Sequence, residues 1–409
     1  MRKNEKPSKS NSYIDAGKTL LVQTRNYPQF KLPKDFRSKT DFLESVVMRK
    51  LPNFYPNAES KILERIDAEL DFLGKTGLDN AFLIAADLLE TMRIDGFSSR
   101  CFWGNASGSV VAYILGITEF DPIKFGLVFE GLFAPINSIL SDFRIYEDTC
   151  VVEANLREKY ENVVHNGGGL IGVGNFRLPE LRCESFRSQV MESGAMIIGA
   201  VPDEFDITVR ELSEMLDGSK MSSDAEVFEF FANADKHFFG IPHFQSKSAK
   251  EYANKLKPDS LSELALIFSC NRPDRYNLLD ELVANKRNPI CAQELHPVID
   301  EITKETYGAI VFKEQWLEAM RRLAGCDYAT ANEWRKNFAK KMGDSGFSEK
   351  IFGRIAVNLQ VGKKDAEEMF NFLGKYADSA FSKAFSLFCV KSAFEIARLR
   401  VALLNRLRS

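Results

Sequence analysis

The stretch that decides the fold reads Trp103-Gly-Asn-Ala-Ser-Gly-Ser-Val-Val-Ala-Tyr-Ile-Leu-Gly-Ile-Thr-Glu-Phe-Asp-Pro-Ile-Lys-Phe-Gly-Leu-Val-Phe-Glu130. Its small residues, from Gly104 to Ser109, predict a tight turn, and the apolar run Val110–Ile117 predicts the start of a buried helix. Backbone N–H groups at a helix N-terminus attract anions, so the turn is a candidate anion site. Taken alone, the same pattern more often reflects only close packing of the turn against its neighbours.

The composition predicts an ordinary globular chain. Of 409 residues, 45% are hydrophobic and 27% are charged, which predicts about two to four domains with an ample core. The formal net charge of −3 predicts no overall attraction to nucleic acid, so any DNA contact needs a local basic patch. Seven cysteines, none in a Cys-x-x-Cys pair, and only four histidines argue against zinc and a disulfide framework, and favour the cytoplasm.

No apolar run is long enough to span a membrane, so no membrane association is expected. Residues 1–18 are polar and lack the apolar segment of a secretory signal, which predicts a disordered tail. Three helices are then expected before the turn. Apolar residues recur at helical spacing from Thr40 and again from Ile62 to Leu73, with an end at Gly74, and Leu78–Met92 is nearly apolar throughout.

The stretch from Trp103 resembles the nucleotide-binding segment of the bacterial replicative DNA polymerase family, the DNA polymerase III alpha subunits. That family reads Gly-Arg-Gly-Ser-x-x-Gly-Ser, then Leu-Val-Ala-Tyr, Leu-Gly-Ile-Thr, Asp-Pro and Leu-Phe-Glu. The resemblance implies that Gly104, Asn105, Gly108 and Ser109 are the remnant of a site for the triphosphate of an incoming nucleotide. Trp103 stands where the family has Arg, and Asn105 where it has Ser. Both changes remove features that suit a triphosphate, so weak or no nucleotide binding is expected.

A strand over the next segment would place Asp142, Arg144 and Tyr146 on one face. In the family, carboxylates on this strand hold two magnesium ions that activate the primer hydroxyl and stabilise the leaving pyrophosphate. The resemblance puts Arg144 and Tyr146 at two of the ligand positions and leaves Asp142 as the only catalytic remnant. The third carboxylate position falls on Gly199 or, in a less favoured match, on Asp206. No metal or other cofactor is therefore expected, and magnesium only if catalysis survives.

The space between Tyr146 and Gly199 is too short for the helical thumb that the family inserts there. It contains the glycine-rich run His165–Gly174, which we interpret as a flexible shortcut where a thumb was lost. The alternative interpretation is a phosphate-binding loop.

Later motifs favour a surviving nucleic-acid surface. Thr306–Gln315 resembles the family's Tyr-Gly-x-x-x-Tyr-Gln-Glu-Gln, Ala331–Lys341 resembles Ala-Asp-x-Leu-Arg-Arg-x-x-x-Lys-Lys, and Phe381–Ser386 resembles Phe-Asn-Lys-Ser-His-Ser. In the family's fingers, the cations of such segments face nucleotide and template. The DNA-binding candidates are Lys313, Arg335, Lys336, Lys340, Lys341 and Lys383. A solvated helix face is an equally good interpretation of each basic run.

The resemblance runs over about residues 27–400 and predicts an α/β plus α fold. A nucleotidyltransferase-like palm is expected over residues 19–215, with the thumb insertion mostly lost near 160–180, and a helical fingers-like domain over 216–409. The leading hypothesis is a DNA polymerase III alpha-like protein of replication or repair that has lost polymerase activity and keeps a DNA- or partner-binding scaffold. Its expected partners are DNA, bound weakly, and replication or mobile-element proteins, and its oligomeric state stays open.

Two alternatives of other classes remain. The first is an active nucleotidyltransferase whose metal ligands come from Asp142, Glu147, Asp148 or Asp206. The second is a protein-interaction module without DNA affinity.

Overall fold

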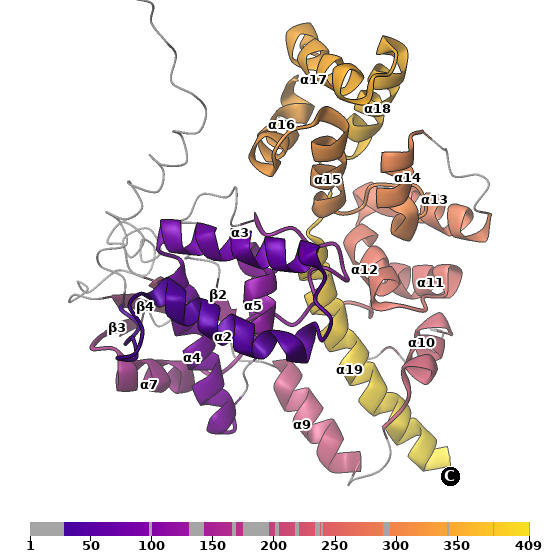
Figure 1. The fold of residues 1–409 in the computed structure, drawn as a ribbon. Helices are drawn as coiled ribbons and strands as arrows, with labels where there is room; N and C mark the ends of the chain where they lie inside the picture. Colours follow the sequence, from indigo (N-terminus) through magenta and orange to yellow (C-terminus); the bar gives the residue numbers. More distant parts are fainter. Residues whose placement is uncertain are drawn as a thin grey trace, which may run out of the picture. The chain divides into compact units, whose positions relative to one another are not determined.

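The structure is a computed structural model, and the chain divides into two compact units, Met1–Asp203 and Glu204–Ser409. The first unit is mixed α/β, and the second is helical in its described part (Figure 1). This confirms the predicted fold class at that level. The structure describes residues 28–97, 100–130, 143–165, 169–174, 196–200, 204–216, 221–233, 238, 240–288, 295–341, 343–378 and 380–408.

The first unit begins with the three helices that the apolar spacing predicted. They are α2 (Lys39–Phe54), α3 (Ser60–Thr76) and α4 (Asp79–Ile94). Their apolar faces pack against one another in one core (Figure 1). The predicted end at Gly74 is wrong, because α3 ends at Gly77, whose φ of 72° forms a left-handed cap. Gly74 lies inside the helix instead, where a Cβ would lie 2.8 Å from the hydroxyl of Thr40 on α2.

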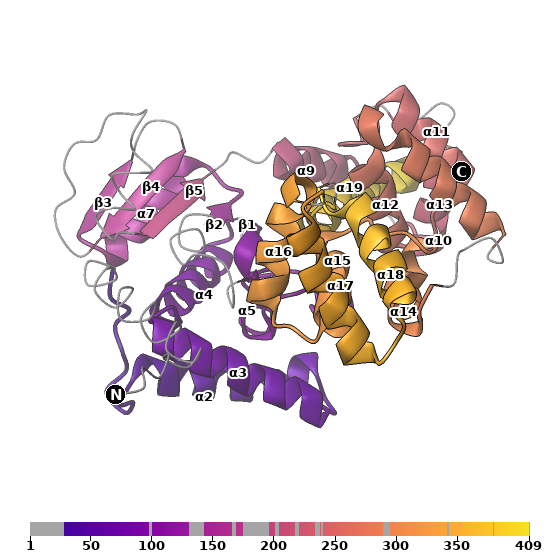
Figure 2. The ribbon, with the colours of Figure 1, turned by 90° about the horizontal axis from the view of Figure 1, so that it is seen from above.

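A five-stranded sheet follows, with strand order β1-β2-β5-β4-β3. Its strands are β1 (Cys101–Trp103), β2 (Phe143–Ile145), β3 (Asn162–His165), β4 (Leu170–Gly174) and β5 (Met196–Ala200). Only β2 and β5 pair in parallel. Helix α7 (Thr149–Lys159) packs against β3 and β4 (Figure 2).

The glycine-rich run does not form the predicted flexible shortcut over its described part. Residues 170–174 form β4, an interior strand of the sheet in which Ile171 and Val173 are fully buried. Residues 166–168 lie outside the described residues. A neighbouring backbone approaches closely directly before this strand, at Gly169, where a Cβ would lie 2.5 Å from the carbonyl oxygen of Ala200.

The described part of the second unit is built from helices and short turns of 3₁₀ helix. They are α9 (Glu204–Leu216), α10 (Asp224–Ala232), α11 (Lys247–Leu256), α12 (Leu261–Cys270), η5 (Pro273–Arg275), α13 (Tyr276–Arg287), α14 (Pro297–Thr303), η7 (Lys304–Thr306), α15 (Lys313–Ala324), α16 (Tyr328–Lys341), α17 (Ser345–Leu359), α18 (Lys363–Tyr376) and α19 (Lys383–Arg408).

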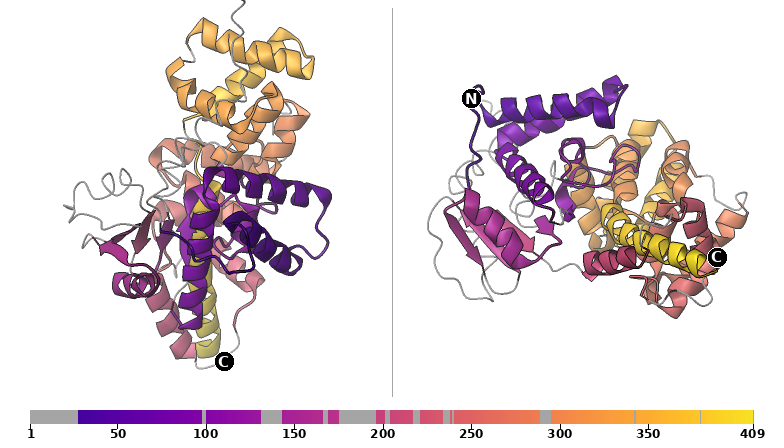
Figure 3. Two further views of the ribbon diagram at one scale, coloured as in Figure 1. Left: turned by 60° about the vertical axis from the view of Figure 1, so that its left-hand side comes forward. Right: turned by 90° about the horizontal axis from the view of Figure 1, so that it is seen from below.

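Helix α9 belongs to the second unit, which begins at Glu204, whereas the expected palm-like domain extends to residue 215. It lies beside α19, where Leu212 and Leu216 meet Leu399 and Ala402 in a small apolar cluster (Figure 3). None of the helices in the described ranges is long and apolar enough to cross a lipid bilayer.

Candidate functional site

The predicted anion turn joins β1 to α5 (Val110–Ile114) through η2 (Gly104–Ala106). Ser109 is the N-cap residue of α5, and its hydroxyl accepts a hydrogen bond from the N–H of Ala112 at 3.0 Å. Asn105 is half-buried and Gly108 is buried. The sequence therefore predicted the turn and the helix start, but α5 has only five residues.

A buried carboxylate already occupies the N-terminus of α5. Glu69 on α3 is 1% exposed and accepts from the Ser109 hydroxyl at 2.7 Å. It also accepts from the backbone N–H groups of Val110 at 3.2 Å and Val111 at 3.1 Å. Arg65, one helical turn earlier on α3, donates to the same carboxylate at 3.1 Å. The donors at the start of α5 therefore serve an internal anion.

Sequence reasoning missed Glu69 and Arg65 as members of this site. The signal was present, because both lie in Glu64-Arg-Ile-Asp-Ala-Glu-Leu70, within the second of the three expected helices. Nothing local links that helix to a turn 40 residues later. Only the packing of α3 against α5 brings them together.

The other residues of the turn serve packing. Trp103 is fully buried, with its ring between those of Phe82 and Phe143 at centroid distances of 5.1 and 5.0 Å. A Cβ on Gly108 would overlap the backbone of Val128 and Phe129, so only glycine fits there. The close-packing interpretation of the small residues therefore accounts for Gly108 without a ligand.

The metal-ligand positions lie on adjacent parallel strands. Arg144 on β2 is exposed between the buried Phe143 and Ile145, and it pairs directly with Gly199 on β5. A Cβ on Gly199 would lie 3.2 Å from Cγ of Arg144. The register thus brings together the two positions that the resemblance assigned to carboxylates. Asp142, the expected catalytic remnant, lies outside the described residues.

Tyr146 follows β2 and is half-buried. Its N–H donates to the carbonyl oxygen of Arg100 at 2.9 Å, and the guanidinium of Arg100 lies 5.0 Å from its ring centroid. This end of the β1–β2 pair therefore presents a cation over an aromatic ring.

Two of the alternative metal ligands, Asp148 and Glu147, accept hydrogen bonds from backbone N–H groups. Asp148 caps α7 and accepts from the N–H of Cys150 at 2.7 Å, and Glu147 accepts from the N–H of Asp148 at 2.9 Å. Asp206 lies on α9 in the second unit. Within the described ranges, no three His, Cys, Asp or Glu side chains are placed to hold a metal ion.

The basic candidates on α16 separate into exposed and half-buried side chains. Lys336, Lys340 and Lys341 are exposed, and no acidic group of the described chain lies within 4 Å of their ammonium groups. Arg335 is half-buried, and its Nη1 donates to the carbonyl oxygen of Ala377 at 3.4 Å. Lys313, at the start of α15, is also half-buried. Three of the predicted cations thus share one exposed helix.

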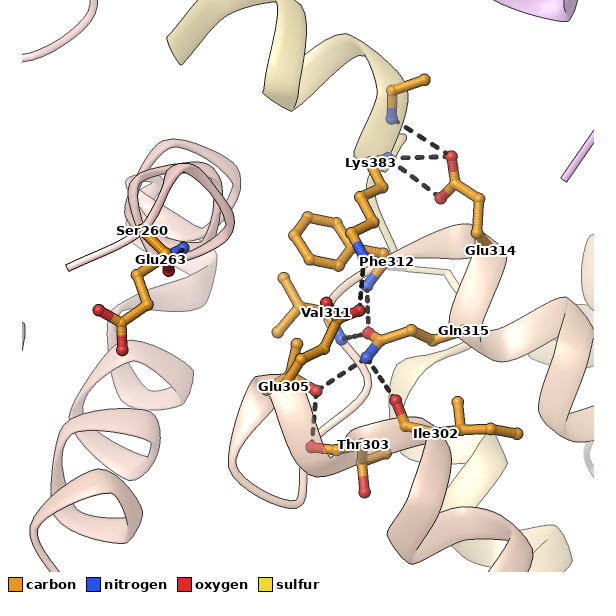
Figure 4. A network of polar contacts seen from close by, with 12 residues as sticks. Ser260, Glu263, Ile302, Thr303, Glu305, Val311, Phe312, Glu314, Gln315 and Lys383 are labelled. Atoms are coloured by element: carbon orange, nitrogen blue, oxygen red, sulfur yellow. Dashed lines mark hydrogen bonds and ion pairs between the residues drawn. The ribbon is translucent and has the colours of Figure 1, made fainter. Parts of the chain in front are cut away.

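Lys383 does not belong to that exposed set, so this expectation is corrected. It is 2% exposed, and its Nζ lies 2.6 Å from Oε1 of Glu305 (Figure 4). Its backbone N–H donates to both carboxylate oxygens of the buried Glu314 at 3.0 Å, which caps α19. The adjacent Gln315 accepts from the N–H groups of Val311 and Phe312 at 3.1 Å. The segments Thr306–Gln315 and Phe381–Ser386 therefore contact each other, and these hydrogen bonds join α15 to α19.

The chain thus contains an α/β unit with a capped Gly/Ser turn and a mixed sheet, followed by a helical unit, and both units match known families. Residues 41–146 match the family model of the bacterial DNA polymerase III alpha NTPase domain. Residues 202–353 match that of the bacterial DNA polymerase III alpha subunit finger domain.

Curated relatives agree with these matches. The chain is 22% identical over 480 residues to DNA polymerase III subunit alpha of Staphylococcus epidermidis (strain ATCC 12228 / FDA PCI 1200), covering 91% of this chain and 44% of the relative. It is 22% identical over 479 residues to that of Treponema pallidum (strain Nichols), covering 90% and 41%. It is 23% identical over 479 residues to that of Staphylococcus aureus (strain Mu50 / ATCC 700699), covering 91% and 44%.

The chain is therefore a homologue of the bacterial DNA polymerase III alpha subunit, and it spans less than half the length of these relatives. The alignments run over more residues than the 409 of the chain, so the relatives carry insertions that this chain lacks.

Proposed function

We propose that this chain is a DNA polymerase III alpha-like protein without polymerase activity, which acts in the cytoplasm as a nucleic-acid-binding scaffold of replication or repair. In this proposal, the first unit is a palm whose catalytic carboxylates have been replaced. The second unit is a fingers domain whose exposed cations remain. Partner proteins of the replication machinery fit the same proposal.

The observation that carries the proposal is the register of β2 and β5. It places Arg144 directly beside Gly199, with no carboxylate at either position. Two-metal catalysis needs negative ligands that hold two divalent cations about 4 Å apart. A guanidinium about 4 Å from one such cation would repel it by about 8 kcal/mol at an effective dielectric constant of ~20. In this proposal, two of the ligand positions have no carboxylate, and Arg144 adds a repulsive charge.

A primer-extension assay tests the loss of activity. With a primed template, the four deoxynucleotides and either magnesium or manganese, the full chain should give no extension above background. Extension that is abolished by Asp142→Ala would contradict the proposal, because it would require a working metal site around the one remaining carboxylate. The Asp142→Ala chain also controls for a contaminating polymerase, since extension that persists in it comes from elsewhere.

The exposed lysines of α16 support the scaffold half of the proposal. Lys336 and Lys340 lie one helical turn apart, and Lys341 is next to them in sequence. Because the net charge of the chain is −3, DNA binding depends on such a local concentration of cations. Phosphate contacts of this kind give weak, sequence-independent binding that falls as salt rises.

Fluorescence anisotropy with a labelled primed template tests the DNA surface. The Lys336→Ala, Lys340→Ala, Lys341→Ala variant should bind more weakly, and each lost phosphate contact should reduce the slope of log affinity against log salt by roughly one. The matched control is Lys363→Ala, Lys364→Ala on α18, whose ammonium groups already lie 3.8 and 3.9 Å from Glu367 and Glu368. Equal affinity and equal salt slope for wild type and the triple variant would favour a protein-interaction module instead.

A further inference from the structure

The connection between α12 and α13 carries a buried arginine at the surface of the second unit. Asn271-Arg-Pro-Asp-Arg275 leads from α12 through η5 to α13. Arg275 is only 6% exposed, whereas Pro273 and Asp274 beside it are exposed. A guanidinium carries a permanent positive charge and five N–H donors, so its burial requires partners.

Two of the three guanidinium nitrogens of Arg275 lack such partners. Its Nε and Nη2 are buried and make no hydrogen bond. In the part of the chain that the structure describes, the acidic group within 4 Å of it is Asp274, whose Oδ2 lies 3.8 Å from Nε. That distance is too long for a hydrogen bond, and the Asp274 side chain is 67% exposed to water. Within the described part of the chain, the charge of Arg275 is therefore balanced only by this distant, largely exposed carboxylate.

Two further sources of positive potential lie near Arg275, namely Arg272 and the start of α13. Burial is the main cause that lowers the pKa of Arg275, and the positive charge of Arg272 lowers it further, whereas Cys270, Asp274 and Tyr376 act in the opposite direction. Arg272 is half-buried, with its guanidinium 5.1 Å from the ring centroid of Phe381. The N-terminus of the twelve-residue helix α13 begins directly after Arg275 and has no side-chain cap. An anion bound near these groups would be stabilised by their positive potential.

We propose that Arg275, together with Arg272 and the N-terminus of α13, forms a binding site for a phosphate-class oxyanion. A tetrahedral oxyanion suits guanidinium groups because each guanidinium donates two parallel hydrogen bonds to two oxygens. The exposed Pro273 and Asp274 place the site at the surface, and the side chain of Arg275 is not held elsewhere by hydrogen bonds through Nε or Nη2. The site is independent of the α16 lysines and of the β2–β5 register.

Calorimetric titration of the full chain with pyrophosphate and with inorganic phosphate, at an ionic strength held constant with sodium chloride, tests the site. Wild type should give saturable binding, and Arg275→Met should weaken it at least tenfold. The Lys336→Ala, Lys340→Ala, Lys341→Ala variant should bind both anions as wild type does, even where it has lost DNA binding. Absence of saturable heat with wild type would overturn the proposal, whatever the outcome of the DNA-binding experiments.

Thermal unfolding supplies a second, independent readout. In phosphate-free buffer, Arg275→Met should melt at the same temperature as wild type or higher, because it removes an uncompensated buried charge. Phosphate should raise the melting temperature of wild type and not that of the variant. A lower melting temperature of Arg275→Met without phosphate, with an unchanged response to phosphate, would show that Arg275 serves packing and would overturn the proposal.

A single-stranded oligonucleotide separates the two sources of phosphate. If the backbone of a nucleic acid supplies the oxyanion, pyrophosphate should displace the oligonucleotide and Arg275→Met should weaken its binding. If a free phosphate compound supplies it, the oligonucleotide should leave the pyrophosphate titration unchanged. Both results require binding at Arg275, and a pyrophosphate titration that Arg275→Met leaves unchanged contradicts both.

Discussion

The turn before α5 and the helix α16 are the two regions where this chain most resembles the polymerase family, and the structure treats them in opposite ways. The turn faces inward. Trp103 is fully buried, and Glu69 accepts the hydrogen bonds that an anion would receive. Helix α16 faces outward with Lys336, Lys340 and Lys341 exposed.

The difference shows that similarity to a family motif does not tell whether the polar groups of that motif are accessible to a ligand. A stretch can keep the sequence of a ligand site because its residues also hold the fold together, as Gly108 does against Val128 and Phe129. Exposed lysines have no such structural constraint, since a surface substitution away from contacts changes stability by only about 0.5 kcal/mol or less. The lysine side chains of α16 are thus accessible to a binding partner, whereas the N–H groups at the start of α5 are occupied by Glu69.

Removing the carboxylate of Glu69 should have the largest effect. Glu69→Ala leaves the Ser109 hydroxyl, two backbone N–H groups and Arg65 without their shared acceptor. Breaking a buried ion pair in this way costs about 3–5 kcal/mol. Urea unfolding followed by circular dichroism should show this loss for Glu69→Ala. The exposed Glu64→Ala on α3 and Lys336→Ala on α16 should stay within about 0.5 kcal/mol of wild type. Equal stability of all three variants would remove the contrast between the regions.

Restoring carboxylates across the β2–β5 register should create metal affinity. In Arg144→Asp, Gly199→Asp, two carboxylates would face the same side of adjacent paired strands. We expect manganese binding with a dissociation constant of about 1 mM, or about 4 kcal/mol, where wild type shows none. Calorimetric titration with manganese chloride measures this, with Arg144→Asp alone as the control. A double variant that binds no better than Arg144→Asp would contradict the observed pairing.

The glycine at position 108 should be irreplaceable, in contrast to a glycine in an exposed helix of the second unit. Gly108→Ala forces a Cβ into the backbone of Val128 and Phe129 and should cost about 3 kcal/mol, near the upper end of overpacking. Gly353→Ala on α17 meets nothing within 4 Å and should stabilise its helix by about 0.5–1 kcal/mol. Thermal unfolding of the two variants shows whether each substitution lowers or raises the melting temperature. A neutral Gly108→Ala would mean that the turn is loosely packed.

The smallest expected effect is that of a nucleotide on the turn. Because Glu69 occupies the start of α5, calorimetric titration with dATP should give a dissociation constant weaker than about 1 mM at this site. If dATP binds at the turn, Gly108→Ala should weaken its affinity. Micromolar affinity that this substitution weakens would show that the turn still accepts a triphosphate.

Local pattern was a good guide to the helices and a poor one to the sheet. The spacing of Leu43, Val47, Ile66 and Leu70 predicted α2 and α3, because a helix buries residues that recur every three or four positions. The glycine-rich run near Gly172 gave no strand signal, since glycine has low strand propensity and its pairing partners lie on β3 and β5. The end of α3 was misplaced for a similar reason, because Gly74 lies inside the helix, where it packs against Thr40 on another helix.

The site was predicted in part. The sequence identified the turn, the exposed lysines of α16 and the positions of Arg144 and Gly199. It missed Glu69 and placed Lys383 on the surface, although Lys383 is buried against Glu305. Both errors concern partners far apart in the chain, at separations of 40 residues for Glu69 and Ser109 and 78 for Lys383 and Glu305.

The sequence by itself determined the resemblance to DNA polymerase III alpha subunits, the helical periodicity and, through that resemblance, the prediction that Arg144 and Tyr146 stand at carboxylate positions. Only the tertiary structure decided which charges are available. Whether a carboxylate or an ammonium group reaches solvent depends on which other elements pack against it, as α3 does for α5 and η7 for α19. Burial and pairing arise from contacts between distant segments, and periodicity along one segment does not encode them.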